Sequence, residues 1–104
     1  MDAKEVEIAV REGRSLAGQN LSGLDLSNLD LKNAMLSNAN LANCNLQGAD
    51  LRGADLSRAS LYNADLRGAK LRRTNLTRSN RTLAKIRKWA LKGAYIAGPT
   101  AYTD

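Results

Sequence analysis

Residues 49–58 read Ala49-Asp50-Leu51-Arg52-Gly53 and then Ala54-Asp55-Leu56-Ser57-Arg58, a five-residue pattern written twice. Five residues advance an α-helix by about 500°, and an odd step turns a strand to its other face, so neither element buries such a series on one side. The chain must therefore turn once per repeat, so that each leucine faces a shared axis. The leucine spacing holds for thirteen repeats, at Leu16, Leu21, Leu26, Leu31, Leu36, Leu41, Leu46, Leu51, Leu56, Leu61, Leu66, Leu71 and Leu76.

The other positions of the repeat agree with this interpretation. Two residues after leucine, Gly or Asn occurs in ten of thirteen repeats, and these residues tolerate the positive φ of a tight corner. The position before leucine is mostly Asp, Asn or Ser, which can hydrogen-bond corner backbone, and the position after it is variable and polar. A run of small residues two before leucine predicts a second inward position, at Ala34, Ala39, Cys44, Ala49, Ala54, Ala59, Ala64 and Ala69.

Written as A(D/N)LxG, the pattern closely resembles that of the pentapeptide-repeat family over residues 14–78. The resemblance implies an all-β solenoid, a right-handed quadrilateral parallel β-helix with four repeats per coil, so that residues twenty apart stack. About three coils are expected in residues 14–80. Residues 1–13 are interpreted as an N-terminal capping helix, and residues 81–104 as a basic C-terminal cap and tail. The first coil should be wider or irregular, because Arg14, Gln19, Leu24 and Leu29 stand where alanine belongs.

The exposed ends of an open β-helix need covers. The stretch Asp2-Ala3-Lys4-Glu5 is typical of a capping box and predicts a helix at about 3–12. Arg81 falls where the next leucine is due, which predicts that the solenoid stops there. The amphipathic spacing of residues 83–91 then favours a basic helix at about 82–92, and the chain from Pro99 onward is interpreted as a flexible tail.

An alternative for the C-terminal region stays open. Ile86, Leu91 and Ile96 keep the five-residue phase, so residues 94–98 could add another repeat, although Trp89 at a small-residue position argues against a continuous solenoid. The apolar and aromatic residues of this region are interpreted either as a cap alone or as a cap that also forms a homodimer contact. They are Ile86, Trp89, Leu91, Tyr95 and Ile96.

The chain has 16 basic and 10 acidic residues, a net charge of +6, and residues 79–104 carry five of the bases and one acid. Stacking at twenty predicts a column of Lys32, Arg52 and Arg72 with Arg73 beside its end, and a second column of Arg58 and Arg78. Such arrays can hold phosphates or carboxylates, and the basic residues of 82–92 would extend them. The alternative is a solvated ladder whose counter-charges come from Asp30 and Asp50.

No chemistry of an active site is visible in the sequence. There is no His and a single Cys, so no metal site, nucleophile–base pair or cofactor is expected, and the protein is not expected to be an enzyme. No stretch is long enough to span a membrane, and a cytoplasmic, bacterial-type protein is the expectation.

A non-catalytic, structural protein-interaction module is the leading functional hypothesis. One alternative is binding of nucleic acid or another polyanion through the basic columns. Another is the topoisomerase-protecting DNA mimicry of some relatives, which the short length and basic charge disfavour.

Overall fold

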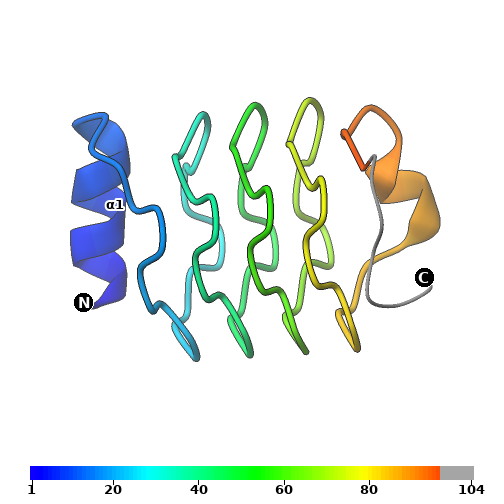
Figure 1. The fold of residues 1–104 in the computed structure, drawn as a ribbon, viewed down its shortest axis with the longest axis horizontal. Coiled ribbons are helices and arrows are strands. Elements are labelled where there is room, and N and C mark those ends of the chain that lie inside the picture. Colours follow the sequence, from blue (N-terminus) through cyan, green and yellow to red (C-terminus); the bar gives the residue numbers. More distant parts are fainter. Residues whose placement is uncertain (97–104) are drawn as a thin grey trace.

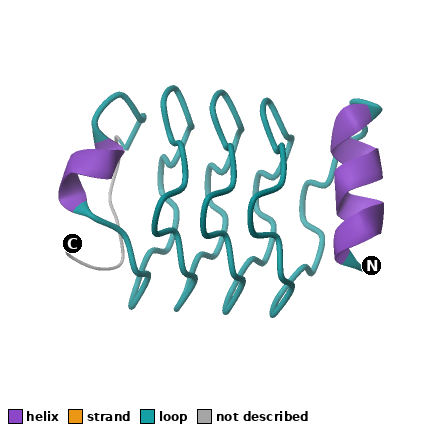
Figure 2. Cartoon of the chain, turned by 180° about the vertical axis from the view of Figure 1, so that it is seen from behind, coloured by secondary structure: helices purple, strands orange, loops and turns teal. Residues whose placement is uncertain are grey.

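The computed structural model describes residues 1–96, which form a stack of coils between two terminal helical segments. Helix α1 (Ala3–Arg11) covers one end, and the 3-10 helix η1 (Lys88–Leu91) lies at the other (Figures 1 and 2). We number the coils as first (14–33), second (34–53), third (54–73) and fourth (from 74). The tail predicted from Pro99 onward lies outside the described residues.

Backbone pairing follows a step of twenty residues. Parallel bridges join Asn20 to Asn40, Asp50 to Lys70 and Asn75 to Tyr95, and each coil donates hydrogen bonds to the next. For example, the Leu51 N–H donates to the Lys70 carbonyl at 2.9 Å, and the Lys70 N–H donates back to the Ala49 carbonyl at 2.9 Å. Because corners follow one another so closely, the coils pair through isolated β-bridges. No strand longer than a single bridge residue forms within residues 1–96.

The corners are β-turns in which each leucine carbonyl accepts from the N–H three residues later, as Leu51 does from Ala54 at 3.0 Å. Such a turn needs a left-handed third residue, the position that glycine and asparagine occupy in most repeats. All thirteen residues at this position have positive φ, from Gly18 to Arg78, and Leu83 extends the series. The non-glycine members are Asn28, Asn33, Asn38, Asn43, Asn63, Arg58, Arg73, Arg78 and Leu83.

The interior consists of the thirteen leucines and the column of small residues, all of them buried. Cys44 and Thr74, two members of the small-residue column, hydrogen-bond in the same way. The Cys44 thiol donates to the Leu21 carbonyl at 3.0 Å, and the Thr74 hydroxyl donates to the Leu51 carbonyl at 2.6 Å. Small side chains at this position let the backbones of adjacent coils lie close together, so the hydrogen bonds between the coils stay short.

Helix α1 covers the first coil as the sequence predicts. Asp2 accepts from the Glu5 N–H at 2.8 Å while the Glu5 carboxylate accepts from the Asp2 N–H at 2.9 Å, which forms the capping box. Val6 and Ala9 are buried in one cluster with the leucines, and Leu24 and Leu29 pack partly buried against it.

The first coil is regular in its backbone pairing, and the expected irregularity is confined to two corners. The corner bonds that end at Leu24 and Leu29 lengthen to 3.3 and 3.4 Å, against 3.1 Å at Ala34. The larger leucine side chains at an alanine position account for this opening.

At the C-terminal end, the predicted stop at Arg81 and the predicted helix at 82–92 are wrong. Arg81 is buried in the leucine register, the chain turns at Leu83, and Lys85 pairs with Asp65. The only helical segment there, within the described residues, is the four-residue η1, after which Tyr95 pairs with Asn75. Backbone pairing with the third coil is favoured over a helix because the third coil presents backbone donors that need acceptors. The Leu66 N–H is one of them, and the Lys85 carbonyl accepts from it at 2.8 Å.

Candidate anion-binding groove

Two members of the predicted basic column, Lys32 and Arg52, have their charges compensated by neighbouring acids. The Lys32 ammonium lies 3.2 Å from the Asp30 carboxylate and 3.6 Å from that of Asp50. The Arg52 guanidinium forms a fork on Asp50, with Nε at 2.9 Å from Oδ1 and Nη2 at 2.6 Å from Oδ2. The counter-charged ladder that the sequence offered as an alternative therefore describes these two residues.

The local structure of the repeat creates these pairs. An acid before leucine accepts the backbone N–H two residues on, as Asp50 does from Arg52 at 3.2 Å, and this turn places the side chains of the two positions together. The Arg52 fork holds the pKa of Asp50 far below its usual value against the opposing effect of desolvation. The backbone N–H and then the ammonium of Lys32 lower the pKa of Asp30.

One coil later the acid is missing. Lys70 follows Asp30 and Asp50 in the stack, so Arg72 stands after a base instead of an acid. On the adjacent side, Asp65 pairs with Arg67 through a fork of 2.9 and 2.6 Å, but Lys85 stacks on Asp65 and precedes Arg87. Acidic residues thus end one coil before the basic ones do. No ion pair is formed by Lys70, Arg72, Arg73, Lys85, Arg87, Lys88 or Lys92 within residues 1–96.

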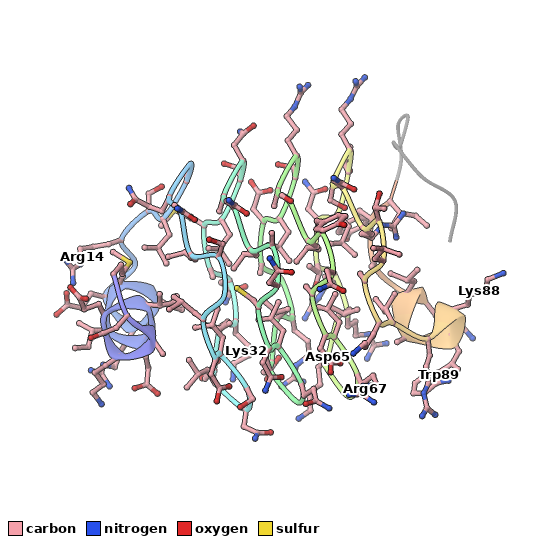
Figure 3. The ribbon with its side chains drawn as sticks, turned by 90° about the horizontal axis from the view of Figure 1, so that it is seen from below. Arg14, Lys32, Asp65, Arg67, Lys88 and Trp89 are labelled. Atoms are coloured by element: carbon pink, nitrogen blue, oxygen red, sulfur yellow. The ribbon has the colours of Figure 1, made fainter. Side chains whose placement is uncertain are left out.

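A groove of about 610 Å³ runs between the third and fourth coils at this place. Its charged border joins the third coil to η1 and its flanks, and its apolar floor includes Ala69 and Leu71. We call it the C-terminal basic groove, bordered by Arg67, Lys70, Arg72, Arg87, Trp89 and Lys92. Figure 3 shows Arg67 and Trp89 on the same side of the molecule, with Trp89 pointing away from the interior.

The structure divides the predicted basic residues among three places. Arg72 borders the C-terminal basic groove, which Arg52 also touches. Lys32, Arg52 and Arg73 line a smaller depression of about 400 Å³ beside it. Arg58 and Arg78 are exposed at their corners and border neither.

The predicted cap residues are also divided. Leu91 is buried and Ile86 is partly buried against the core, so these two close the end of the stack. Trp89, Tyr95 and Ile96 are exposed, Trp89 by 72% of its surface, so they do not act as a cap within the described part of the chain. Self-association through this end stays a prediction.

Arg67 and Lys70 were not among the residues that the sequence singled out. The signal was present in the position before leucine: Asp30, Asp50, Lys70 along one side and Asp25, Asn45, Asp65, Lys85 along the next. A change of sign along a stacked column marks where the compensating acids end. The basic column by itself does not contain this change of sign.

The five-residue repeat that forms these coils matches a known protein family. A family model described as pentapeptide repeats matches residues 15–48 and 39–78. The chain belongs to the pentapeptide-repeat family. No curated protein has a matching sequence.

Solved structures of three pentapeptide-repeat proteins are similar to this chain. Rfr23 from the cyanobacterium Cyanothece 51142 is 33% identical, with a TM-score of 0.71 over 86% of this chain and 61% of its own. The protein alr5209 from Nostoc Pcc 7120 is 32% identical, with a TM-score of 0.68 over 92% and 96%. AT2G44920, from the thylakoid lumen of Arabidopsis thaliana, is 31% identical, with a TM-score of 0.54 over 92% and 62%. This chain therefore spans about three fifths of the first and third relatives and nearly all of the second.

Proposed function

We propose that this pentapeptide-repeat protein is a non-catalytic interaction module. In this proposal a right-handed quadrilateral β-helix rigidly presents the C-terminal basic groove to an acidic partner protein. The observation that carries it is that Lys70 takes the place of an acid in the stacked column of Asp30 and Asp50. Beyond this point Arg72, Arg87 and Lys92 face the groove without a carboxylate partner among the described residues. A groove of one sign attracts partners of the other sign and speeds their association.

The interior supports a binding role over a catalytic one. Leucine and alanine side chains fill it, and no group of three His, Cys, Asp or Glu residues that could hold a metal occurs within residues 1–96. The one thiol, Cys44, is buried, and burial raises its pKa, which makes it a poor nucleophile. Within the described residues no helix is long and apolar enough to cross a membrane. As a separate part of the proposal, we place the protein in the cytoplasm.

Nucleic-acid binding is the second candidate, because Trp89 stands beside the cations of the groove. Single-stranded nucleic acids are held by basic grooves that carry aromatic stacking platforms. DNA mimicry is disfavoured, since a mimic needs a negative surface and this chain carries +6.

Affinity capture with a matched variant tests the proposal. Immobilised full-length protein is exposed to a nuclease-treated lysate of the producing organism, in parallel with the triple variant Arg72→Ser, Arg87→Ser, Lys92→Ser. We expect acidic proteins to be retained by the wild type, lost from the variant, and released by about 0.3 M salt because screening weakens such contacts. Retention of the same proteins by the wild type and the variant would refute an acidic protein partner. So would an untreated lysate from which the wild type retains nucleic acid and no protein.

A further inference from the structure

The hydrogen-bond ladder is interrupted at one place inside the stack. In the second coil, the Gly48 N–H donates to the Arg67 carbonyl at 3.1 Å and the Leu51 N–H donates to the Lys70 carbonyl at 2.9 Å. Their counterparts one coil later, the N–H groups of Gly68 and Leu71, have no hydrogen-bond partner among residues 1–96.

The carbonyl between these two donors is unpaired as well. Ala49 accepts from the Lys70 N–H, but the corresponding carbonyl of Ala69 accepts no bond within the described residues, because the Ala90 N–H donates to Arg87 at 2.9 Å instead. Pairing is intact on both sides of the gap, where Leu66 donates to Lys85 at 2.8 Å and Arg73 to Gly93 at 2.8 Å. The gap therefore has fixed ends and a backbone pattern of donor, acceptor and donor.

Two residues of the fourth coil cause the gap. Trp89 occupies the register that alanine fills elsewhere, and an indole cannot enter the narrow interior that the neighbouring coil leaves. Lys88 stands in the left-handed register but does not adopt positive φ there. The chain instead forms η1, places Trp89 outside, and leaves the third coil without backbone partners between Gly68 and Leu71.

The gap opens into the C-terminal basic groove, which Gly68, Ala69 and Leu71 help to line. A backbone edge with unpaired groups, like the edge strand of a sheet, is a template for another chain. Here that edge lies among cations that favour acidic side chains, with Trp89 available for an apolar side chain of the same segment.

We propose that the Gly68–Leu71 edge binds an extended acidic segment of a partner protein by backbone pairing. This inference rests on the proposed function, and it names the chemistry of that partner. A peptide backbone offers both the acceptors that Gly68 and Leu71 need and the donor that Ala69 needs. A phosphodiester backbone offers acceptors only and would leave the Ala69 carbonyl unpaired.

Amide hydrogen exchange in the free full-length protein tests the edge itself. The Gly68 and Leu71 amides should exchange at least about 100-fold faster than those of Gly48 and Leu51, which stand in the same registers with partners. Equal protection of the two pairs would mean that the edge is not available, and the proposal would fall.

Binding is tested with a blocked decapeptide of alternating Val and Glu at low salt, which is acidic and favours an extended backbone. We expect the peptide to slow exchange of the Gly68 and Leu71 amides about tenfold or more. The same peptide with alternate amides N-methylated keeps its charge but loses donors, and should bind at least about tenfold more weakly. Absence of peptide binding, or tighter binding of a dT decamer, would overturn the proposal.

A double variant closes the edge without touching the third coil. Lys88→Gly with Trp89→Ala restores the repeat pattern at residues 84–93, so the fourth coil should pair with Gly68 and Leu71. This pairing should protect the amides of Gly68 and Leu71 from exchange and weaken binding of the peptide about tenfold or more. The control Lys88→Ser, which loses the same charge but keeps Trp89, should bind like the wild type. Undiminished binding by the double variant would overturn backbone pairing.

These outcomes separate the two proposals. Suppose that peptide binding is lost in the Arg72→Ser, Arg87→Ser, Lys92→Ser variant and yet is unaffected by N-methylation and by closure of the edge. That result would support the acidic partner and refute backbone pairing at the Gly68–Leu71 edge. Failure of the affinity capture would remove the acidic partner even if the model peptide binds.

Discussion

At the scale of single residues, the position two after leucine sets the cost of each corner. All of these positions have positive φ, which glycine adopts freely, asparagine tolerates, and other residues adopt at a cost of about 1–2 kcal/mol. Asparagines can also pair along the stack, as Asn63 does when it donates to the Asn43 side chain at 2.9 Å. Arginine at Arg58, Arg73 and Arg78 has neither advantage.

Arg58→Asn should therefore stabilise the protein. The introduced asparagine would occupy the same left-handed corner with less strain and would stack on Asn38, one coil earlier, in the manner of the Asn63–Asn43 pair. We expect a gain of about 0.5–1 kcal/mol in the free energy of unfolding, measured by urea denaturation.

The matched control is Arg72→Asn, which removes the same charge at a position without positive φ and should change stability by less than about 0.5 kcal/mol. Repeating both measurements in about 0.5 M salt screens the repulsion between arginines. An equal gain in both variants would show that charge, and not the corner, limits stability.

At the scale of elements, the two ends of the stack are closed differently. Helix α1 is specified by local signals: a capping box holds its start, and Val6 and Ala9 present one apolar face to the first coil. The fourth coil has no such independent signal. It is shaped by the open edge of the third coil and by the size of Trp89.

Val6→Asp should detach α1 from the first coil. The substitution removes an apolar side chain whose burial contributes about 1.5–3 kcal/mol, and it places a carboxylate where no partner exists among the described residues, at a cost of several kcal/mol more. We expect a loss of stability above about 3 kcal/mol and end-to-end association of the uncovered coils, detected by light scattering after size-exclusion chromatography.

Lys4→Asp is the control, because Lys4 lies on the exposed side of the same helix. It should leave the protein monomeric and its stability within about 0.5 kcal/mol. A Val6→Asp protein with the same mass and stability as this control would show that the helix is not a necessary cap.

At the scale of the whole molecule, charge is paired in the first coils and unpaired in the last. The pKa values of Asp25, Asp30, Asp50 and Asp65 are all lowered by hydrogen bonds from the residue two positions on. A carboxyl group whose folded pKa is depressed stabilises the protein above its unfolded pKa and loses that contribution as pH falls through the folded pKa.

Stability should accordingly be nearly constant from about pH 7 to about pH 5 and fall as the pH drops below about 4. A series of urea denaturation curves between neutral pH and about pH 2 measures it. The variant Asp50→Asn, Asp65→Asn lacks the two carboxylates that arginine forks hold, so it should be less stable at neutral pH and decline less steeply in acid. Parallel curves for the variant and the wild type would contradict a stabilising role for these pairs.

The repeat itself could be predicted from the sequence because its signal is periodic and each position has one physical demand. Leu51 faces the axis, Ala49 permits close approach, and Gly53 turns the corner, and thirteen copies leave no other arrangement that buries every leucine. The capping box of Asp2 and Glu5 is equally local, since both partners lie within one helical turn.

The C-terminal end was decided by tertiary structure. Ile86 and Leu91 fit a helical spacing with Leu83 and a five-residue spacing with Ile96, so the sequence alone does not choose between helix and coil. The choice was made by the backbone donors of the third coil, which are satisfied by carbonyls such as those of Thr82 and Lys85 and would lose them if residues 82–92 were helical.

The groove has the same origin. Its cations are visible in the sequence, but their grouping required the fourth coil to lift at Trp89, and the unpaired edge at Gly68 and Leu71 exists only because of that lift. Periodic sequence determines a repeating unit because every copy meets the same surroundings. The last coil has a neighbour on one side only, so its conformation depends on contacts that no repeat pattern contains.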